Sequence, residues 1–245
     1  MEEFKNKPVK LDIGEQINDA FEIFKKVAVT GGLAMLSIYI TIFMLFVIGM
    51  GFFFKADDVQ MAMKNFKPET FTFNGQMIYL GAIVIFSALI SPFMAGLIKM
   101  ARDADNNEEV QFTSIFAYVN SPQFIDIILA TTTLTVVSTG SNMLLKYYII
   151  DSVATFLGAL ISLLIVALTY LVIPHIIFGK LDFIKAIGRS ASQILANFFP
   201  AILLMAIAFI LAIVGVFAFC IGILFTMPLI YIMHYCIYKK LNTDT

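Results

Sequence analysis

Residues 70–98 read TFTFNGQMIYLGAIVIFSALISPFMAGLI, a run without a single Asp, Glu, Lys or Arg. A bilayer core about 30 Å thick is crossed by roughly 20 helical residues, so this stretch is long enough to span a membrane. Three further charge-free runs of comparable length are residues 27–54, 127–145 and 152–179. A fifth run, residues 198–238, is about twice as long as one crossing needs, and Gly215 and Gly222 permit a tight turn near its middle. The pattern predicts an all-α protein with six transmembrane helices.

The composition points to the same class. Hydrophobic residues make up 60% of the 245, and only 13% are charged, against roughly 25% in a soluble domain. A water-soluble fold of this size has too little interior to bury that much apolar surface. The net charge is −1, and without a basic patch nucleic acid is not an expected partner. We therefore expect a single integral membrane domain over residues 1–245.

The basic residues predict the orientation, because Lys and Arg are enriched in cytoplasmic connections. With six spans, one side of the membrane carries Lys5, Lys7, Lys10, Lys25, Lys26, Lys99, Arg102, Lys180, Lys185, Arg189, Lys239 and Lys240, and the other carries Lys55, Lys64, Lys67 and Lys146. Twelve against four places both termini in the cytoplasm. The N-terminal segment has no signal-peptide pattern, so a bacterial cytoplasmic (inner) membrane is the expected location.

The chain shows a threefold pattern. A short amphipathic segment with apolar positions at helical spacing precedes the first, third and fifth spans, and such segments are typical of cytoplasmic-side interfacial helices. The second, fourth and sixth spans contain Pro92, Pro174 and Pro228, each of which removes a helical hydrogen bond. This predicts three repeat units, residues 11–101, 112–180 and 181–240, related by an axis along the membrane normal. The alternative is that amphipathic leaders and prolines, both common in membrane proteins, coincide here.

Several short stretches carry a family resemblance. They are residues 95–101, 107–110, 112–116, 183–186 with Ser190, 197–198 and 222–229. Together they resemble the membrane domain attached to some bacterial glycerophosphodiester phosphodiesterases, and its free-standing six-helix relatives. The resemblance implies a six-helix fold in the cytoplasmic membrane. It transfers no catalytic residue, because the soluble phosphodiesterase domain has no counterpart among these residues.

Catalytic and metal sites find no support in the sequence. The two histidines, His175 and His234, lack metal-ligand spacing, and no cofactor is expected. Cys220 and Cys236 lie 16 residues apart, about 24 Å along one helix, which is too far for a disulfide. The pair Glu108 and Glu109 belongs with Asp103, Asp105 and Asn106 to a polar segment that we interpret as a solvated cytoplasmic turn.

The third span is rich in hydroxyl groups, and two interpretations remain open for it. Its polar side chains are Thr131, Thr132, Thr133, Thr135, Ser138, Thr139, Ser141 and Asn142. They form either a polar path for a ligand or, as we favour, hydrogen bonds between helices. Ala154, Gly158 and Ser162 recur every four residues on the fourth span, where close packing against another helix of the chain is the default and a dimer contact the alternative.

We therefore predict a non-enzymatic protein, a scaffold or accessory subunit that contacts membrane lipids or a membrane-protein partner through its interfacial helices. The alternative is a transporter or lipid-handling protein with a cytoplasm-facing cavity. The candidate cavity residues are Ser91, Pro92, Thr132, Thr135, Pro174, His175, Pro228 and His234. The candidate membrane-interface or partner residues are Phe21, Phe24, Phe116 and Ile187. The oligomeric state is left open.

Overall fold

The computed structural model describes residues 10–53, 72–217 and 222–242, and over these ranges the regular secondary structure is all helical. Four helices are long: α1 (Ile13–Phe53), α3 (Phe73–Asp105), α4 (Phe124–Tyr148) and α5 (Asp151–Leu168). The shorter elements are η2 (Phe112–Phe116), α6 (Val172–Ile177), α7 (Phe183–Ala196), α8 (Phe198–Val214), η3 (Gly215–Phe217), α9 (Gly222–Thr226) and α10 (Pro228–Asn242). The predicted all-α class is confirmed.

Four segments in the described part of the chain are long and apolar enough to cross a membrane. They are Ile13–Met44, Phe73–Asp105, Phe124–Tyr148 and Ser152–Ile177, so the hydroxyl-rich third span is a long helix as predicted. A fifth crossing results if α7 and α8, which meet at 101°, count as one broken span. The predicted sixth span is divided between α9 and α10, of 5 and 15 residues, and neither alone is long enough to cross. Six spans therefore remain a prediction.

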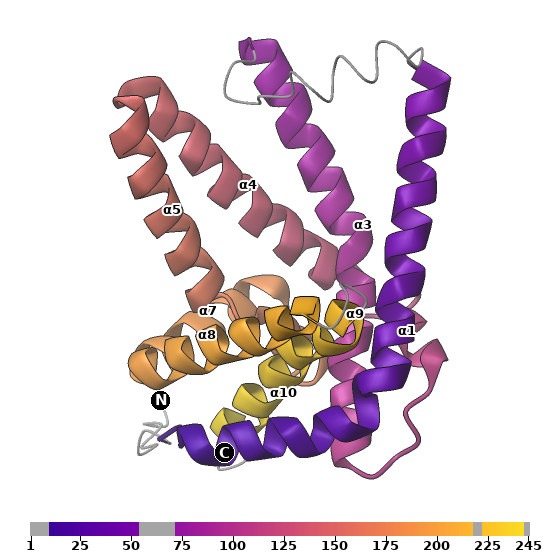
Figure 1. Cartoon of the computed structure of the whole chain (residues 1–245). Coiled ribbons are helices and arrows are strands. Elements are labelled where there is room, and N and C mark those ends of the chain that lie inside the picture. Colours follow the sequence, from indigo (N-terminus) through magenta and orange to yellow (C-terminus); the bar gives the residue numbers. More distant parts are fainter. Residues whose placement is uncertain (1–9, 54–71, 218–221, 243–245) are drawn as a thin grey trace.

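The long helices and the short ones divide the molecule into two regions (Figure 1). The start of α1 runs along one end of the molecule, where α7, α8 and α10 also lie across the direction of the long helices. We call this end the base; it comprises residues 10–38, 91–130, 167–217 and 222–242. The rest of the four long helices, residues 39–53, 73–90, 131–148 and 151–166, we call the arms. The start of α1 and the end of α10 both lie at the base.

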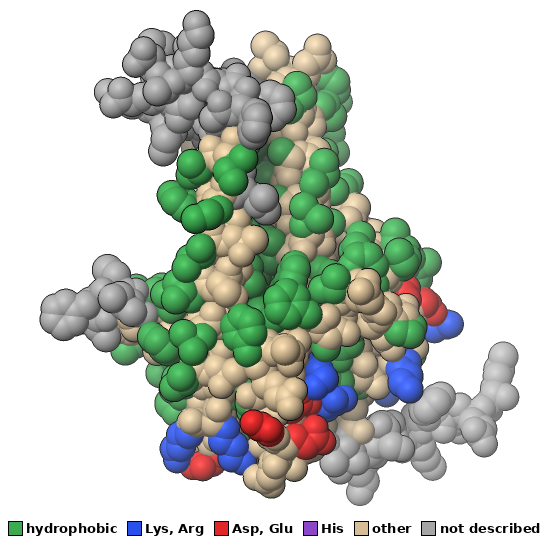
Figure 2. Space-filling model, turned by 90° about the vertical axis from the view of Figure 1, so that its right-hand side faces the viewer, with side chains coloured by type: hydrophobic (Ala, Val, Ile, Leu, Met, Phe, Trp, Pro, Cys, Tyr) green, Lys and Arg blue, Asp and Glu red, His purple; other side chains and the backbone are tan. Residues whose placement is uncertain are grey.

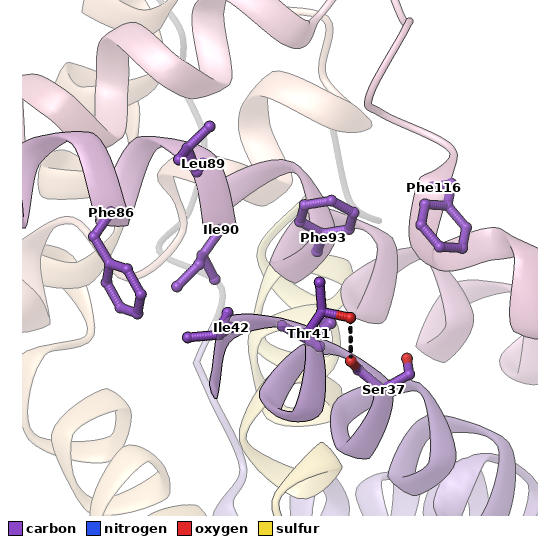
Figure 3. Close-up of a pocket in the computed structure, with 9 residues that line it drawn as sticks. Ser37, Thr41, Ile42, Phe86, Leu89, Ile90, Phe93 and Phe116 are labelled. Atoms are coloured by element: carbon purple, nitrogen blue, oxygen red, sulfur yellow. Dashed lines mark hydrogen bonds between the residues drawn. The ribbon is translucent and has the colours of Figure 1, made fainter. Parts of the chain in front are cut away.

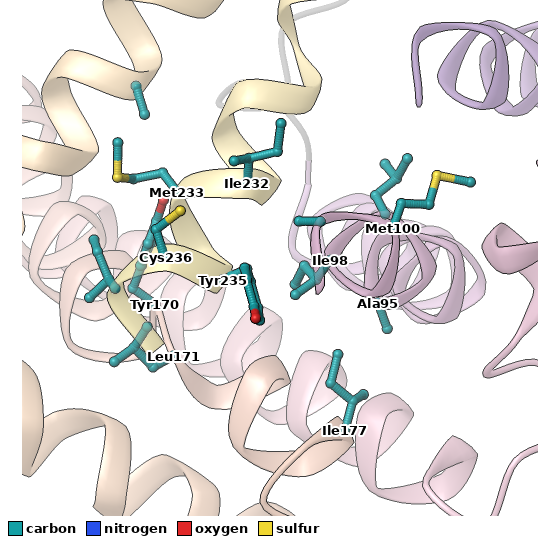
Figure 4. Packing of buried hydrophobic residues seen from close by; sticks show 14 of the residues in the cluster. Ala95, Ile98, Met100, Tyr170, Leu171, Ile177, Ile232, Met233, Tyr235 and Cys236 are labelled. Carbon is teal, nitrogen blue, oxygen red and sulfur yellow. The ribbon is translucent and has the colours of Figure 1, made fainter. Parts of the chain in front are cut away.

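The packed core lies in the base. All buried hydrophobic residues in the described ranges belong to the base except Ala154. Figure 4 shows side chains from α3, α6 and α10 converging there, with Ile98, Leu171 and Ile232 among those that are fully buried. Because α10 packs against α1, α3 and α8, the C-terminal helix closes this core.

The three prolines differ in their effect on the helices. Pro92 lies inside α3, which continues through it, and Ser91 Oγ donates a hydrogen bond of 2.9 Å to the Ala88 carbonyl that the proline leaves without its helical donor. Pro174 and Pro228 lie instead in the first turn of a helix. The helix is interrupted there: α6 starts just before Pro174, and α10 starts at Pro228, because proline is well tolerated in a first helical turn.

The three amphipathic leaders also adopt different structures. The first is continuous with its span inside α1, the second is the five-residue 3₁₀ turn η2, and the third is the separate helix α7. A Cβ on Gly96 would come within 2.5 Å of the Ile115 backbone, so η2 lies directly against α3. The structure does not confirm the threefold repeat.

Candidate functional site

The hydroxyl-rich face of α4 holds helices together. Thr135 and Ser87 on α3 share a hydrogen bond of 3.0 Å between their hydroxyl oxygens. On the side toward α5, Ser138 Oγ donates to Ser162 Oγ at 3.3 Å, and Asn142 Nδ2 donates to the same oxygen at 2.8 Å. Thr132 is half-buried on the same helix. Of the two interpretations left open by the sequence, these contacts support hydrogen bonding between helices.

The small-residue face of α5 packs within the chain. Ala154 is buried, and a Cβ on Gly158 would lie 2.1 Å from Asn142 Oδ1, so the α4 side chain fills the space that the glycine leaves. Ser162 completes the face by accepting the hydrogen bond from Asn142. This face therefore contacts α4, which is the default that the sequence predicts.

The two histidines lie in the interface between the α5–α6 region and α10, and each has its own aromatic partner. His234 stacks on Tyr170, with ring centroids 3.6 Å apart, while the His175 ring meets the Tyr238 ring edge-on at 5.0 Å. His175 is buried, and its Nε2 shares a hydrogen bond of 2.8 Å with Gln193 Oε1 on α7. Both side chains therefore join helices of the base to one another.

Ser190 provides hydrogen-bond partners for the backbone where the helix is interrupted before Pro174. Its Oγ donates to the Leu168 carbonyl at 2.7 Å and accepts from the Leu171 backbone N–H at 3.0 Å. These two backbone groups have no helical hydrogen-bond partner where α5 ends. The buried Ser190 side chain on α7 supplies that partner from a neighbouring helix. This role could not be predicted from the sequence, because Ser190 and Leu168 are far apart along the chain.

Charged side chains tie the end of α10 to the ends of α1 and α3. Asp105 accepts hydrogen bonds from the Tyr235 hydroxyl at 2.7 Å and from Lys239 Nζ at 2.7 Å, and Lys240 pairs with Glu15 at 2.8 Å. Asp103 is buried and pairs with Lys99.

These contacts correct the predicted solvated turn. Glu108 and Glu109 are exposed as expected, but Asp103 and Asp105 are structural partners. Tyr118 is buried beside this cluster, and burial raises its pKa to about 12, so it stays protonated. At the start of α7, the hydrogen bond from Lys185 lowers the pKa of the Asp182 carboxyl, which also caps the helix.

A groove of about 480 Å³ lies between α1 and α3 (Figure 3). Its lining is apolar apart from Ser37 and Thr41, whose hydroxyls donate to the carbonyls of Ala34 and Ser37 in their own helix at 2.7 and 2.8 Å. The other lining residues are Ile38, Ile42, Phe86, Leu89, Ile90, Phe93 and Phe116.

The predicted site residues fall in different places. Ser91, Pro92, Pro174, His175 and Pro228 are buried in the base, while Thr132, Thr135 and His234 are partly buried, and the α1–α3 groove is lined by none of these eight. Among the predicted interface residues, Phe21 and Phe116 are exposed, whereas Phe24 and Ile187 pack partly against the core. Phe116 also lines the groove.

No metal-binding group of three or more His, Cys, Asp or Glu side chains occurs within the described ranges. Cys236 is buried and unbridged, whereas Cys220 lies outside the described residues. Comparison with protein-family models, with curated proteins and with solved structures finds no match.

Proposed function

We propose that this chain is a non-enzymatic integral protein of the bacterial cytoplasmic membrane, a scaffold or accessory subunit that contacts lipids or a membrane-protein partner. The observation that carries the proposal is the separation of surface types. Large apolar side chains are exposed along the arms, among them Phe43, Ile78, Ile85 and Leu163. Figure 2 shows hydrophobic side chains over the flanks of the molecule and charged ones gathered toward one end. Such a belt is stable in lipid and unfavourable in water.

The orientation follows from the charges. The base carries the paired Lys and Arg residues at the ends of α3 and α10, so we place it on the cytoplasmic side, with both termini of the protein there. In this arrangement α7 lies in the interface. A six-span topology requires α8 and α9–α10, which lie across the long helices in this structure, to turn into the bilayer as the last two spans. The threefold repeat and the resemblance to the phosphodiesterase-associated membrane domain stay parts of this proposal.

The packing of the base favours a scaffold over a transporter. Ser91 and His175, two candidate cavity residues, are buried and hydrogen-bonded within the protein. Leu171 and Ile176 are fully buried members of the core of the base.

The α1–α3 groove favours one second candidate, lipid handling. Its apolar lining and its position between two membrane-crossing helices suit a lipid acyl chain. Its size of about 480 Å³ falls in the usual range for small-molecule sites.

The test is mass spectrometry of the full chain extracted gently from its native membrane, comparing wild type with the double variant Phe21→Asp/Phe116→Asp. We expect a protein partner in stoichiometric amount with wild type, and its loss from the variant. The matched control, Asn18→Asp/Asn120→Asp, adds the same charges at exposed polar positions nearby and should retain the partner. Enrichment of one lipid without any protein would favour lipid handling, and full partner retention by the Phe variant would overturn the proposed surface.

A further inference from the structure

A second pocket, of about 330 Å³, lies in the base where the end of α3, the α6–α7 connection and the end of α10 meet. Its polar lining comes from Arg102, Lys180, Tyr235, Tyr238, Lys239 and Asn242. Three cations thus face one small pocket that also offers hydroxyl and amide groups. None of these residues belongs to the α1–α3 groove.

Two carboxylates of the described residues lie near these cations. Asp105 pairs with Lys239 at 2.7 Å and also accepts the Tyr235 hydroxyl. Asp103 is held by Lys99 and reaches Arg102 only at 3.5 Å. Lys180 is exposed, and it forms no ion pair within the part of the chain that the structure describes. Among the described residues, four cations around the pocket, which are Lys99, Arg102, Lys180 and Lys239, therefore meet the two carboxylates of Asp103 and Asp105.

Arg102 is prepared for an anion. Its guanidinium lies over the Phe178 ring, 5.0 Å from the centroid, which fixes the plane of the guanidinium. Its Nε is buried and has no hydrogen-bond acceptor among the described residues. A buried donor without an acceptor is unfavourable. The Arg102 side chain is 37% exposed and lines the pocket, so its other guanidinium N–H groups can reach an anion there. The planar guanidinium matches phosphate oxygens in a two-point contact.

We infer that this pocket binds a phosphate group, with Arg102 as the principal donor, Lys180 as a second cation, and Lys239 held in place by Asp105. A site of this chemistry accepts either the headgroup of an anionic phospholipid or a free phosphate compound. The site goes beyond the proposed scaffold function and does not depend on it. Its lining shares no residue with the Phe21 and Phe116 surface.

The experiment measures binding by the purified full-length protein in a neutral detergent. Native mass spectrometry scores retention of added phosphatidylglycerol against phosphatidylcholine, and inorganic phosphate is then added as a competitor. The variants are Arg102→Gln, Lys180→Gln and their combination. The matched control is Lys185→Gln, an exposed cation of the base that pairs with Asp182 and lies outside the pocket.

We expect wild type and Lys185→Gln to prefer phosphatidylglycerol. Each pocket variant should weaken binding about tenfold, as expected for loss of one charge-assisted contact. Competition by inorganic phosphate would assign the site to free phosphate compounds, and its failure to compete would assign it to lipid headgroups. If Arg102→Gln does not fold, Lys180→Gln decides the matter, because Lys180 is exposed. Equal binding by Lys180→Gln and Lys185→Gln, or no preference for an anionic ligand, would overturn the inference.

Discussion

The base and the arms are built from the same long helices but are held together in different ways. In the base, fully buried side chains, ion pairs and hydrogen bonds join five or more helices, and the backbone of η2 lies directly on α3 at Gly96. In the arms, neighbouring helices contact one another mainly through small residues and hydroxyl groups, and their apolar side chains face outward. The packed core thus lies in the base, whereas the arms expose apolar side chains on helices that are long and apolar enough to cross a membrane. Four pairs of substitutions test this comparison.

The largest expected effect is at Gly96. The substitution Gly96→Ala places a Cβ within 2.5 Å of the Ile115 backbone. Backbone atoms cannot rotate away as the end of a flexible side chain can, so the clash is not easily relieved. We expect a loss of about 3 kcal/mol in the free energy of unfolding, at the upper end for overpacking. The measurement is unfolding by sodium dodecyl sulfate in mixed micelles.

The control for Gly96 lies on the arm part of the same helix. A Cβ on Gly81 meets no atom within 4 Å, so Gly81→Ala should be neutral or stabilise the helix by roughly 0.5–1 kcal/mol. If both variants behaved alike, the contrast between the base and the arms would not hold at this helix.

The next effect is at Ser190. The substitution Ser190→Ala leaves the Leu168 carbonyl and the Leu171 N–H without their buried partner, so we expect a loss of about 2 kcal/mol. The exposed Ser192 on the same helix provides the control, and Ser192→Ala should change stability by less than about 0.5 kcal/mol. Thermal unfolding in detergent compares the two, and equal midpoints would contradict the role of Ser190 at the helix break.

A smaller effect is expected in the arms at Gly158. A Cβ there would lie 2.1 Å from the Asn142 side chain, which can rotate away at the cost of its hydrogen bond to Ser162. We expect Gly158→Ala to cost about 1 kcal/mol. The control is Gly140→Ala on α4, where a Cβ meets no atom within 4 Å. Crosslinking between cysteines introduced on α4 and α5 would report whether the pair separates; unchanged crosslinking and stability would refute close packing at this face.

The smallest effect concerns the hydrogen bond between Ser87 and Thr135. A double-mutant cycle with Ser87→Ala and Thr135→Val should give a coupling energy of about 0.6 kcal/mol, the average for hydrogen bonds between membrane helices. Thr133 is exposed on the same helix, and the cycle of Ser87→Ala with Thr133→Val should give no coupling. A coupling above about 2 kcal/mol would show that polar contacts stabilise the arms as strongly as packing stabilises the base.

The sequence predicted the long helices well, because their signal is local. Charge-free runs determine where a helix can cross lipid, and the structure has long apolar helices over residues 27–44, 73–98, 127–145 and 152–177. The prediction was weaker over residues 198–238, where the same apolar composition suits one long span, two short ones or a broken helix. Apolar content alone does not choose among these, because the choice depends on what each turn packs against.

The candidate site could be predicted only in part. The sequence singled out His175, His234 and the hydroxyls of α4 as chemically unusual, and the structure gives each of them a partner inside the protein. It did not indicate the pocket around Arg102, since its cations come from residues 102, 180 and 239 and are brought together only by the packing of α3, α6 and α10. Asp105 looked like a loop residue for the same reason.

The sequence by itself determined the all-helical class, the long apolar helices and the end of the molecule at which most of the described charged residues lie. These properties follow from hydropathy and charge summed over neighbouring residues. Apolar segments favour lipid and charged segments favour water, whatever contacts they make with distant parts of the chain. Tertiary structure alone decided that Pro92 continues a helix while Pro174 and Pro228 interrupt one, that Ser190 satisfies the break in another helix, and that three distant cations share a pocket. Each of these depends on a partner far away in the chain, because the free energy of a buried polar group is set by its neighbours in space.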